Sequence, residues 1–155
     1  TSLASPTRGV IAGGYRPSSL PQNVMDFVTI STSGDAIDFG DLTVEVHLAM
    51  PASSVTRGLI AGGYNFTDTI GFITIATTGN ASDFGNLTQS RAGGNGTSNS
   101  IRGVFAGGIS PTYRDTIDFV TISSAGNATD FGNLASARHY LFNGQCADAH
   151  GGLGE

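Results

Sequence analysis

The sequence predicts an all-β protein built from three copies of one repeated unit. The chain of 155 residues contains 23 glycines and no tryptophan, and only 12% of its residues are charged. Ser, Thr, Asn and Gly are abundant, as is typical of many short strands joined by turns. Three blocks of similar sequence recur in the same order, and helical periodicity is absent. We therefore expect a single repeat domain over residues 1–155, with units at roughly 7–55, 56–100 and 101–155.

The first block is a short apolar segment that begins with Arg-Gly and ends in two glycines. Its copies are Arg8–Gly14, Arg57–Gly63 and Arg102–Gly108, and their arginines lie 49 and 45 residues apart. Apolar residues bounded by glycine predict a buried inner strand that other backbone segments approach closely.

The second block predicts a half-buried strand, because a phenylalanine and β-branched residues recur in all three copies. The copies are Asp26–Ile30, Gly71–Ile75 and Asp118–Ile122. A glycine followed by Asp or Asn comes shortly after each copy, and such a pair predicts a tight hairpin turn.

The third block, Asp-Phe-Gly followed by Asp or Asn and Leu, predicts the strand after this turn. Its copies are Asp38–Leu42, Asp83–Leu87 and Asp130–Leu134. A fourth strand is expected in the segment that returns to the next unit, around residues 44–50, 88–93 and 135–142. Each unit is thus predicted to be an antiparallel meander.

The loop after the paired glycines is the segment that varies in length. It has 12, 8 and 10 residues before the phenylalanine of the second block, whereas the spacing from that phenylalanine to the third block is constant. Loops on one face of a repeat protein are common binding surfaces, and aromatic rings can stack on sugars. The alternative is that these loops cover sheet edges or pack between subunits. The candidate binding residues are Tyr15, Arg16, Tyr64, Asn65, Phe66, Tyr113 and Arg114.

Two charged positions recur in every unit, and we expect an architectural role for both. They are Arg8, Arg57 and Arg102 in the first block and Asp38, Asp83 and Asp130 in the third. Each arginine is expected to pair with an aspartate at the inner edge of its sheet, because such pairs satisfy both groups. The alternative is a ring of arginines that binds an anionic sugar. Arg91 and Arg138 recur in two units and are expected to make surface contacts.

Composition and motifs argue against an enzyme. The Asp-Phe-Gly copies match a metal-binding motif of kinases, but the chain has no lysine to accompany it. We expect His47, His139 and His150 to fall at different repeat positions; they lack metal-ligand spacing, so no metal or cofactor is predicted. The net charge of −5 argues against nucleic-acid binding. Because no apolar run approaches the roughly 20 residues of a membrane span, no membrane association is expected.

The three blocks resemble the kelch repeat. In that family an apolar strand ends in Gly-Gly, a variable loop follows, and a later strand carries an aromatic anchor. The kelch tryptophan is missing, and Phe39, Phe84 and Phe131 are the residues that could pack in its place. The amino-acid sequence of the blocks, together with the ending Asp148–Leu153, is most similar to kelch-like repeats in virion proteins of marine tailed bacteriophages.

The resemblance implies propeller blades, but three units do not close a propeller, which usually has four to eight blades. Three arrangements stay open. Two chains pool their units in one ring, the chain is part of a longer array, or three sheets form a three-sided β-prism. We also expect a homo-oligomer, a dimer or trimer, because three units leave sheet edges to cover.

The resemblance further implies a structural and binding component of a phage virion, such as a tail fibre, an appendage or a capsid-surface protein. Its loops would be presented outside the cell to a host surface glycan or to another virion protein. Two other classes stay open. One is a subunit of a cellular extracellular filament or surface layer, and the other is a propeller-type carbohydrate-active enzyme with acidic or histidine residues in one pocket.

Overall fold

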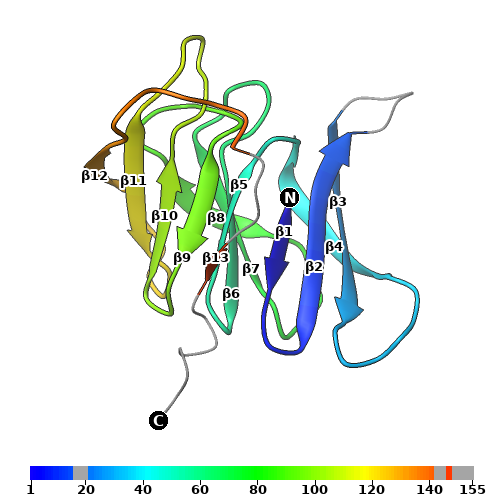
Figure 1. Ribbon diagram of the computed structural model, residues 1–155. Coiled ribbons are helices and arrows are strands. Elements are labelled where there is room, and N and C mark those ends of the chain that lie inside the picture. The colour runs from blue at the N-terminus through cyan, green and yellow to red at the C-terminus, as the bar shows by residue number, and fades with distance from the viewer. Residues whose placement is uncertain (16–20, 142–145, 148–155) are drawn as a thin grey trace.

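The computed structural model describes residues 1–15, 21–141 and 146–147, and these residues form strands without any helix. The all-β prediction is therefore confirmed. No helix long and apolar enough to cross a membrane occurs in the described part of the chain. The strands form three sheets, each with four antiparallel strands that follow one another in space as they do along the chain (Figure 1).

The first sheet consists of β1 (Ser2–Ala4), β2 (Arg8–Tyr15), β3 (Pro21–Thr29) and β4 (Ile37–Val46). The second consists of β5 (Met50–Ser53), β6 (Arg57–Ala61), β7 (Thr69–Thr74) and β8 (Ser82–Asn86). The third consists of β9 (Asn95–Ser98), β10 (Arg102–Ala106), β11 (Thr116–Thr121) and β12 (Thr129–Asn133). The short β13 (Cys146–Ala147) pairs in parallel with β9.

The three sequence blocks form strands, as predicted, and they are the second, third and fourth strands of each sheet. The register repeats as well, because the apolar residue two places after each arginine lies opposite the phenylalanine of the second block. These pairs are Val10 with Phe27, Leu59 with Phe72, and Val104 with Phe119.

The predicted position of the remaining strand was wrong. The observed strands Met50–Ser53 and Asn95–Ser98 begin later than expected and open the following sheet, and residues 135–141 form no strand. Sheet boundaries therefore precede the unit boundaries expected at 56 and 101. Packing explains the difference: a β-carbon on Gly96 would overlap the carbonyl group of Pro51, so β9 lies directly against β5. Hydroxyl groups join these inner strands, with Ser53 Oγ donating to Ala4 O at 3.1 Å and Ser98 Oγ to Ser53 O at 2.8 Å.

The Gly-Asn pairs do not form the predicted tight turns. The connections between β7 and β8 and between β11 and β12 turn earlier, and their Gly-Asn pairs instead bind the preceding sheet. Gly79 N donates to Phe39 O at 2.7 Å, and Asn80 Oδ1 accepts from Asp41 N at 3.0 Å. Gly126 and Asn127 make the same two contacts with Phe84 O and Asn86 N. We call this set of contacts the turn-to-strand junction.

Successive sheets pack face to face and enclose two separate apolar cores. The first core lies between the first and second sheets and includes Leu3, Phe39 and Ile75. The second lies between the second and third sheets and includes Leu59, Phe84 and Phe105. Within the described residues, the middle sheet is therefore covered on both faces, whereas each outer sheet has one covered face (Figure 1).

A comparison of two equivalent glycines tests the turn-to-strand junction. Gly85 and Gly132 have similar φ values of 143° and 138°, but a β-carbon on Gly85 would overlap Gly126, whereas nothing lies within 4 Å of one on Gly132. Both alanine variants incur backbone strain, so their difference isolates the packing. We expect Gly85→Ala to lower the free energy of unfolding by about 1–3 kcal/mol more than Gly132→Ala, measured by urea denaturation in dilute solution. Equal losses would contradict the junction.

Candidate functional site

The variable loops after β6 and β10 gather at one end of the molecule, which we call the loop end, and the end of β2 lies there as well (Figure 1). The connections that follow β4 and β8 and the described residues 134–141 after β12 also reach it (Figure 1). Backbone hydrogen bonds tie these segments together: Tyr64 N donates to His47 O at 2.8 Å, and Gly93 N donates to Leu48 O at 2.8 Å. The opposite end, which we call the hairpin end, carries the short connections between the other strands.

Two candidate tyrosines meet at the loop end on either side of a histidine. The ring of His47 stacks on Tyr64 with 4.2 Å between centroids and lies 5.4 Å from the ring of Tyr15. Both tyrosines are exposed. His47 follows β4, so it joins a loop of the first sheet to a loop of the second.

A second histidine stack lies in the last part of the described chain. His139 stacks on Tyr113 at 4.2 Å and contacts Tyr140 at 3.9 Å, and both tyrosines are exposed. The expectation that the histidines fall at different repeat positions was wrong for this pair. His47 follows Leu42 by five residues and His139 follows Leu134 by five, while Ala92 holds the position in the second unit. This spacing was the sequence signal for the two stacks.

The remaining candidate residues differ from one another in exposure, backbone conformation and hydrogen bonding. Asn65 and Phe66 are exposed and adopt positive φ values of 75° and 54°, which non-glycine residues rarely do. Arg114 is half-buried, and its guanidinium donates to Ser110 O within the same loop. Arg16 lies outside the described residues. The loop end thus presents aromatic rings and one amide, but Arg114 is already engaged.

Partial burial affects the chemistry of His47. Desolvation lowers the pKa of His47 from its ordinary value of 6.5, so the imidazole is neutral at pH 7. Its Nδ1 is buried and has no hydrogen-bond partner among the described residues. A neutral imidazole between two tyrosines forms an aromatic surface without charge, suited to stacking on the apolar face of a ligand.

The repeated arginines lie at the hairpin end, far from these stacks, and their predicted pairing with aspartates is wrong. Within the described residues no carboxylate lies within 4.0 Å of Arg8, Arg57 or Arg102. Each guanidinium instead covers a phenylalanine of its own sheet at 4.5–4.9 Å. Arg8 Nη1 also donates to Ile75 O at 3.1 Å, and Arg57 Nη1 to Ile122 O at 3.0 Å. Arg8 and Arg57 therefore join sheets, while Asp38, Asp83 and Asp130 are exposed.

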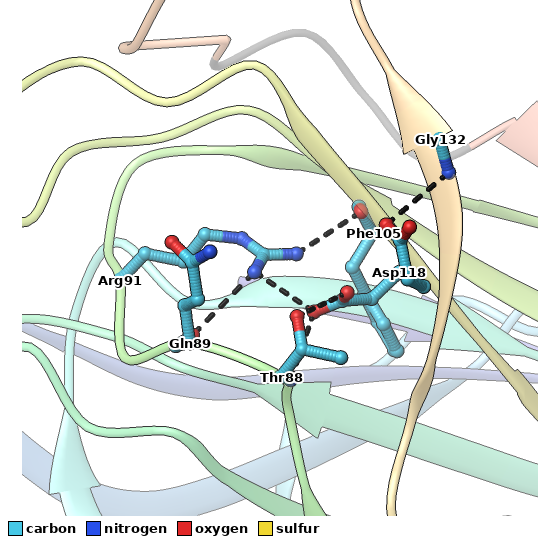
Figure 2. A network of polar contacts seen from close by, with 7 residues as sticks. Thr88, Gln89, Arg91, Phe105, Asp118 and Gly132 are labelled. Carbon is cyan, nitrogen blue, oxygen red and sulfur yellow. Dashed lines mark hydrogen bonds and ion pairs between the residues drawn. The ribbon is translucent and has the colours of Figure 1, made fainter.

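Arg91 was expected at the surface but is fully buried with Asp118 between the second and third sheets. Arg91 Nη1 lies 2.8 Å from Asp118 Oδ2, and its Nη2 donates to Phe105 O at 3.1 Å (Figure 2). Thr88 completes the site, because its hydroxyl donates to Asp118 Oδ1 at 2.6 Å and its N–H to Oδ2 at 3.1 Å. The site is closed and structural, since both charged side chains are 0% exposed.

The equivalent place between the first and second sheets is filled without charge. Val46 stands at the repeat position of Arg91 and Gly71 at that of Asp118, and both line one small pocket. The two junctions thus use either an arginine with an aspartate or a valine with a glycine. In the part of the chain described, no group of three His, Cys, Asp or Glu side chains could hold a metal ion.

No protein-family model matches this chain, and no curated protein matches it either. Ligand binding is therefore inferred from the loop end itself.

The lowered pKa of His47 predicts a pH dependence of stability. Between the pKa in the folded protein and the unfolded value of about 6.5, the unfolded chain binds more protons. The contribution of His47 to the free energy of unfolding should therefore decrease as the pH falls below that value and stay constant above it. NMR titration of the imidazole should give a midpoint below 6.5. His47→Phe, which keeps a ring but no titrating group, should remove this part of the pH dependence; a midpoint at or above 6.5 would contradict the prediction.

The buried ion pair predicts strong coupling between its partners. Asp118→Gly leaves the charge of Arg91 buried and unpaired, which should cost about 3–5 kcal/mol of unfolding free energy, and Arg91→Val leaves Asp118 in the same state. The double variant Arg91→Val/Asp118→Gly copies the residues of the first junction. We expect it to be more stable than either single variant in urea denaturation. Additive losses would show that the two side chains do not depend on each other.

Proposed function

We propose that this protein is a kelch-like structural and binding component of a phage virion, and that its loop end binds a host surface glycan without covalent chemistry. The main support for glycan binding is the pair of Tyr–His stacks at one end of a β scaffold. Exposed tyrosine rings stacked on histidines match the apolar faces of sugar rings, and the imidazole of His47 is neutral. The amide of Asn65, the residue after Tyr64, supplies a polar partner.

The packing of the sheets supports the blade interpretation over the three-sided prism. Successive sheets enclose separate cores in pairs, as neighbouring propeller blades do, whereas a prism would surround one shared core. Phe39 and Phe84 are buried in these cores, in keeping with the anchoring role that the kelch tryptophan has. Virion location and self-association are parts of this proposal that rest on the resemblance of the repeats and on the uncovered outer sheets.

Glycan binding at the loop end is tested with a glycan array followed by calorimetry on the ligands that bind. Tyr64→Ala removes one ring from the His47 stack and should weaken binding at least about tenfold, because anchoring aromatic residues contribute more than 1.4 kcal/mol. Val55→Ala is the control, since Val55 is also exposed in the middle sheet but lies in the connection between β5 and β6 at the hairpin end. It should leave binding unchanged.

Two results would overturn the glycan assignment. One is the absence of binding to any glycan when the loop end is intact, which would direct the search to another virion protein. The other is an equal loss of binding in both variants, which would place the glycan away from the His47 stack.

A further inference from the structure

The outer sheets expose residues that are buried at both internal junctions. Phe131 of the third sheet is 54% exposed, whereas the equivalent Phe39 and Phe84 are each 2% exposed. Ile30 at the end of the first sheet's β3 is 57% exposed, whereas its equivalents Ile75 and Ile122 are 0% and 1% exposed. The free face of the third sheet therefore carries the residues that pack on a following sheet at the internal junctions. The free face of the first sheet carries the residues that pack on a preceding sheet.

The polar groups of the junction are also present on these two faces. Arg102 covers Phe119 at 4.7 Å, as Arg8 and Arg57 cover their phenylalanines, but no carbonyl of the described residues accepts a hydrogen bond from its guanidinium. The acceptor that would correspond is Ile30 O. Likewise, Gly34 and Asp35 stand at the positions of Gly79 and Asn80, which bind the preceding sheet. The groups that would bind Gly34 and Asp35 in the same way are Phe131 O and Asn133 N of a preceding molecule.

The decisive residues are one arginine and one aspartate that remain after the internal junctions are formed. Arg138 has the repeat position of Arg91 and is exposed, and Asp26 has that of Asp118 and is half-buried. The backbone of Arg138 is already placed like that of Arg91. Its N–H donates to Arg114 O at 3.1 Å and its carbonyl accepts from Gly108 N at 2.9 Å, matching the contacts of Arg91 with Thr67 and Gly63 at 3.2 and 3.0 Å.

Asp26 is placed like Asp118 as well. Asp26 lies opposite Ile11 in its sheet, as Asp118 lies opposite Phe105. Within the chain, valine faces glycine at one junction and arginine faces aspartate at the other. The residues at these positions on the two free faces are Arg138 and Asp26. The two faces therefore have complementary charges at the position of the buried ion pair.

We propose that the third sheet of one molecule packs on the first sheet of a second copy of this chain, and that Arg138 forms an ion pair with Asp26 of that copy. This inference specifies the self-association within the proposed function and does not depend on what the loop end binds. The contact joins different faces, so it either closes into a ring or continues as an open chain. One inner-strand contact would be missing, because Ala4 has no hydroxyl where Ser53 and Ser98 have one.

The test is a charge exchange read by analytical ultracentrifugation over a range of concentrations. Wild-type protein should associate reversibly. Asp26→Arg and Arg138→Asp should each weaken association at least about 30-fold, because each places like charges in a desolvated contact. The double variant Asp26→Arg/Arg138→Asp restores opposite charges and should recover most of the association. Both residues are at least partly exposed in the single chain, so circular dichroism should show unchanged folding.

Asp83→Arg is the matched control, since it makes the same change of charge at an exposed site of the middle sheet. It should leave association unchanged. A monomer at every soluble concentration would overturn the proposal, and so would a double variant weaker than both single variants or an equal effect of Asp83→Arg. Glycan binding by a monomer would leave the proposed function of the loop end intact, so the two failures are distinguishable.

Discussion

The structure depends on the close approach of one sheet's connecting turn to the last strand of the sheet before it. A β-carbon on Gly40 would lie 2.6 Å from the backbone of Gly79, so a neighbouring sheet leaves room only for glycine at this position. The phenylalanine beside it is buried in the same junction. Hydrogen bonds, apolar burial and the arginine contact at the hairpin end all follow from this approach. A repeated motif that looks local in sequence is therefore an intersheet contact.

The buried ion pair of Arg91 and Asp118 in the second junction favours one order of the three sheets over others. A buried ion pair is often no more stabilising than an apolar filling, because desolvation offsets the attraction. A mismatched junction is costly, however. If Arg91 faced Gly71, a charge would be buried without a partner; if Val46 faced Asp118, a carboxylate would be. With three similar units in one chain, this difference favours the correct pairing of sheets over alternatives that bury similar apolar area.

The sequence predicts the parts of the fold whose residues carry a local pattern. The three strands with repeated blocks are of this kind, and their register follows from the repeat. Met50–Ser53 and Asn95–Ser98 share no such pattern, because they are held by contact between inner strands rather than by propensity. Arg91 could not be assigned to the interior from its own segment, since its partner Asp118 lies in another unit at a position where the middle unit has glycine. The two stacked histidines, by contrast, could be recognised as equivalent from the sequence, because each lies five residues after Leu42 or Leu134.

The separation of the two ends explains how loop variation is compatible with a fixed scaffold. Loops of different length leave from the loop end, whereas the turn contacts and Arg8 and Arg57 hold the sheets together from the hairpin end. At the loop end, His47 links the first two sheets, because its stack spans the first junction from Tyr15 to Tyr64. Tyr15 has the repeat position of Tyr64, and His139 has that of His47. A second copy docked on the third sheet would therefore bring its Tyr15 toward His139, so that self-association would extend the aromatic surface from one molecule to the next.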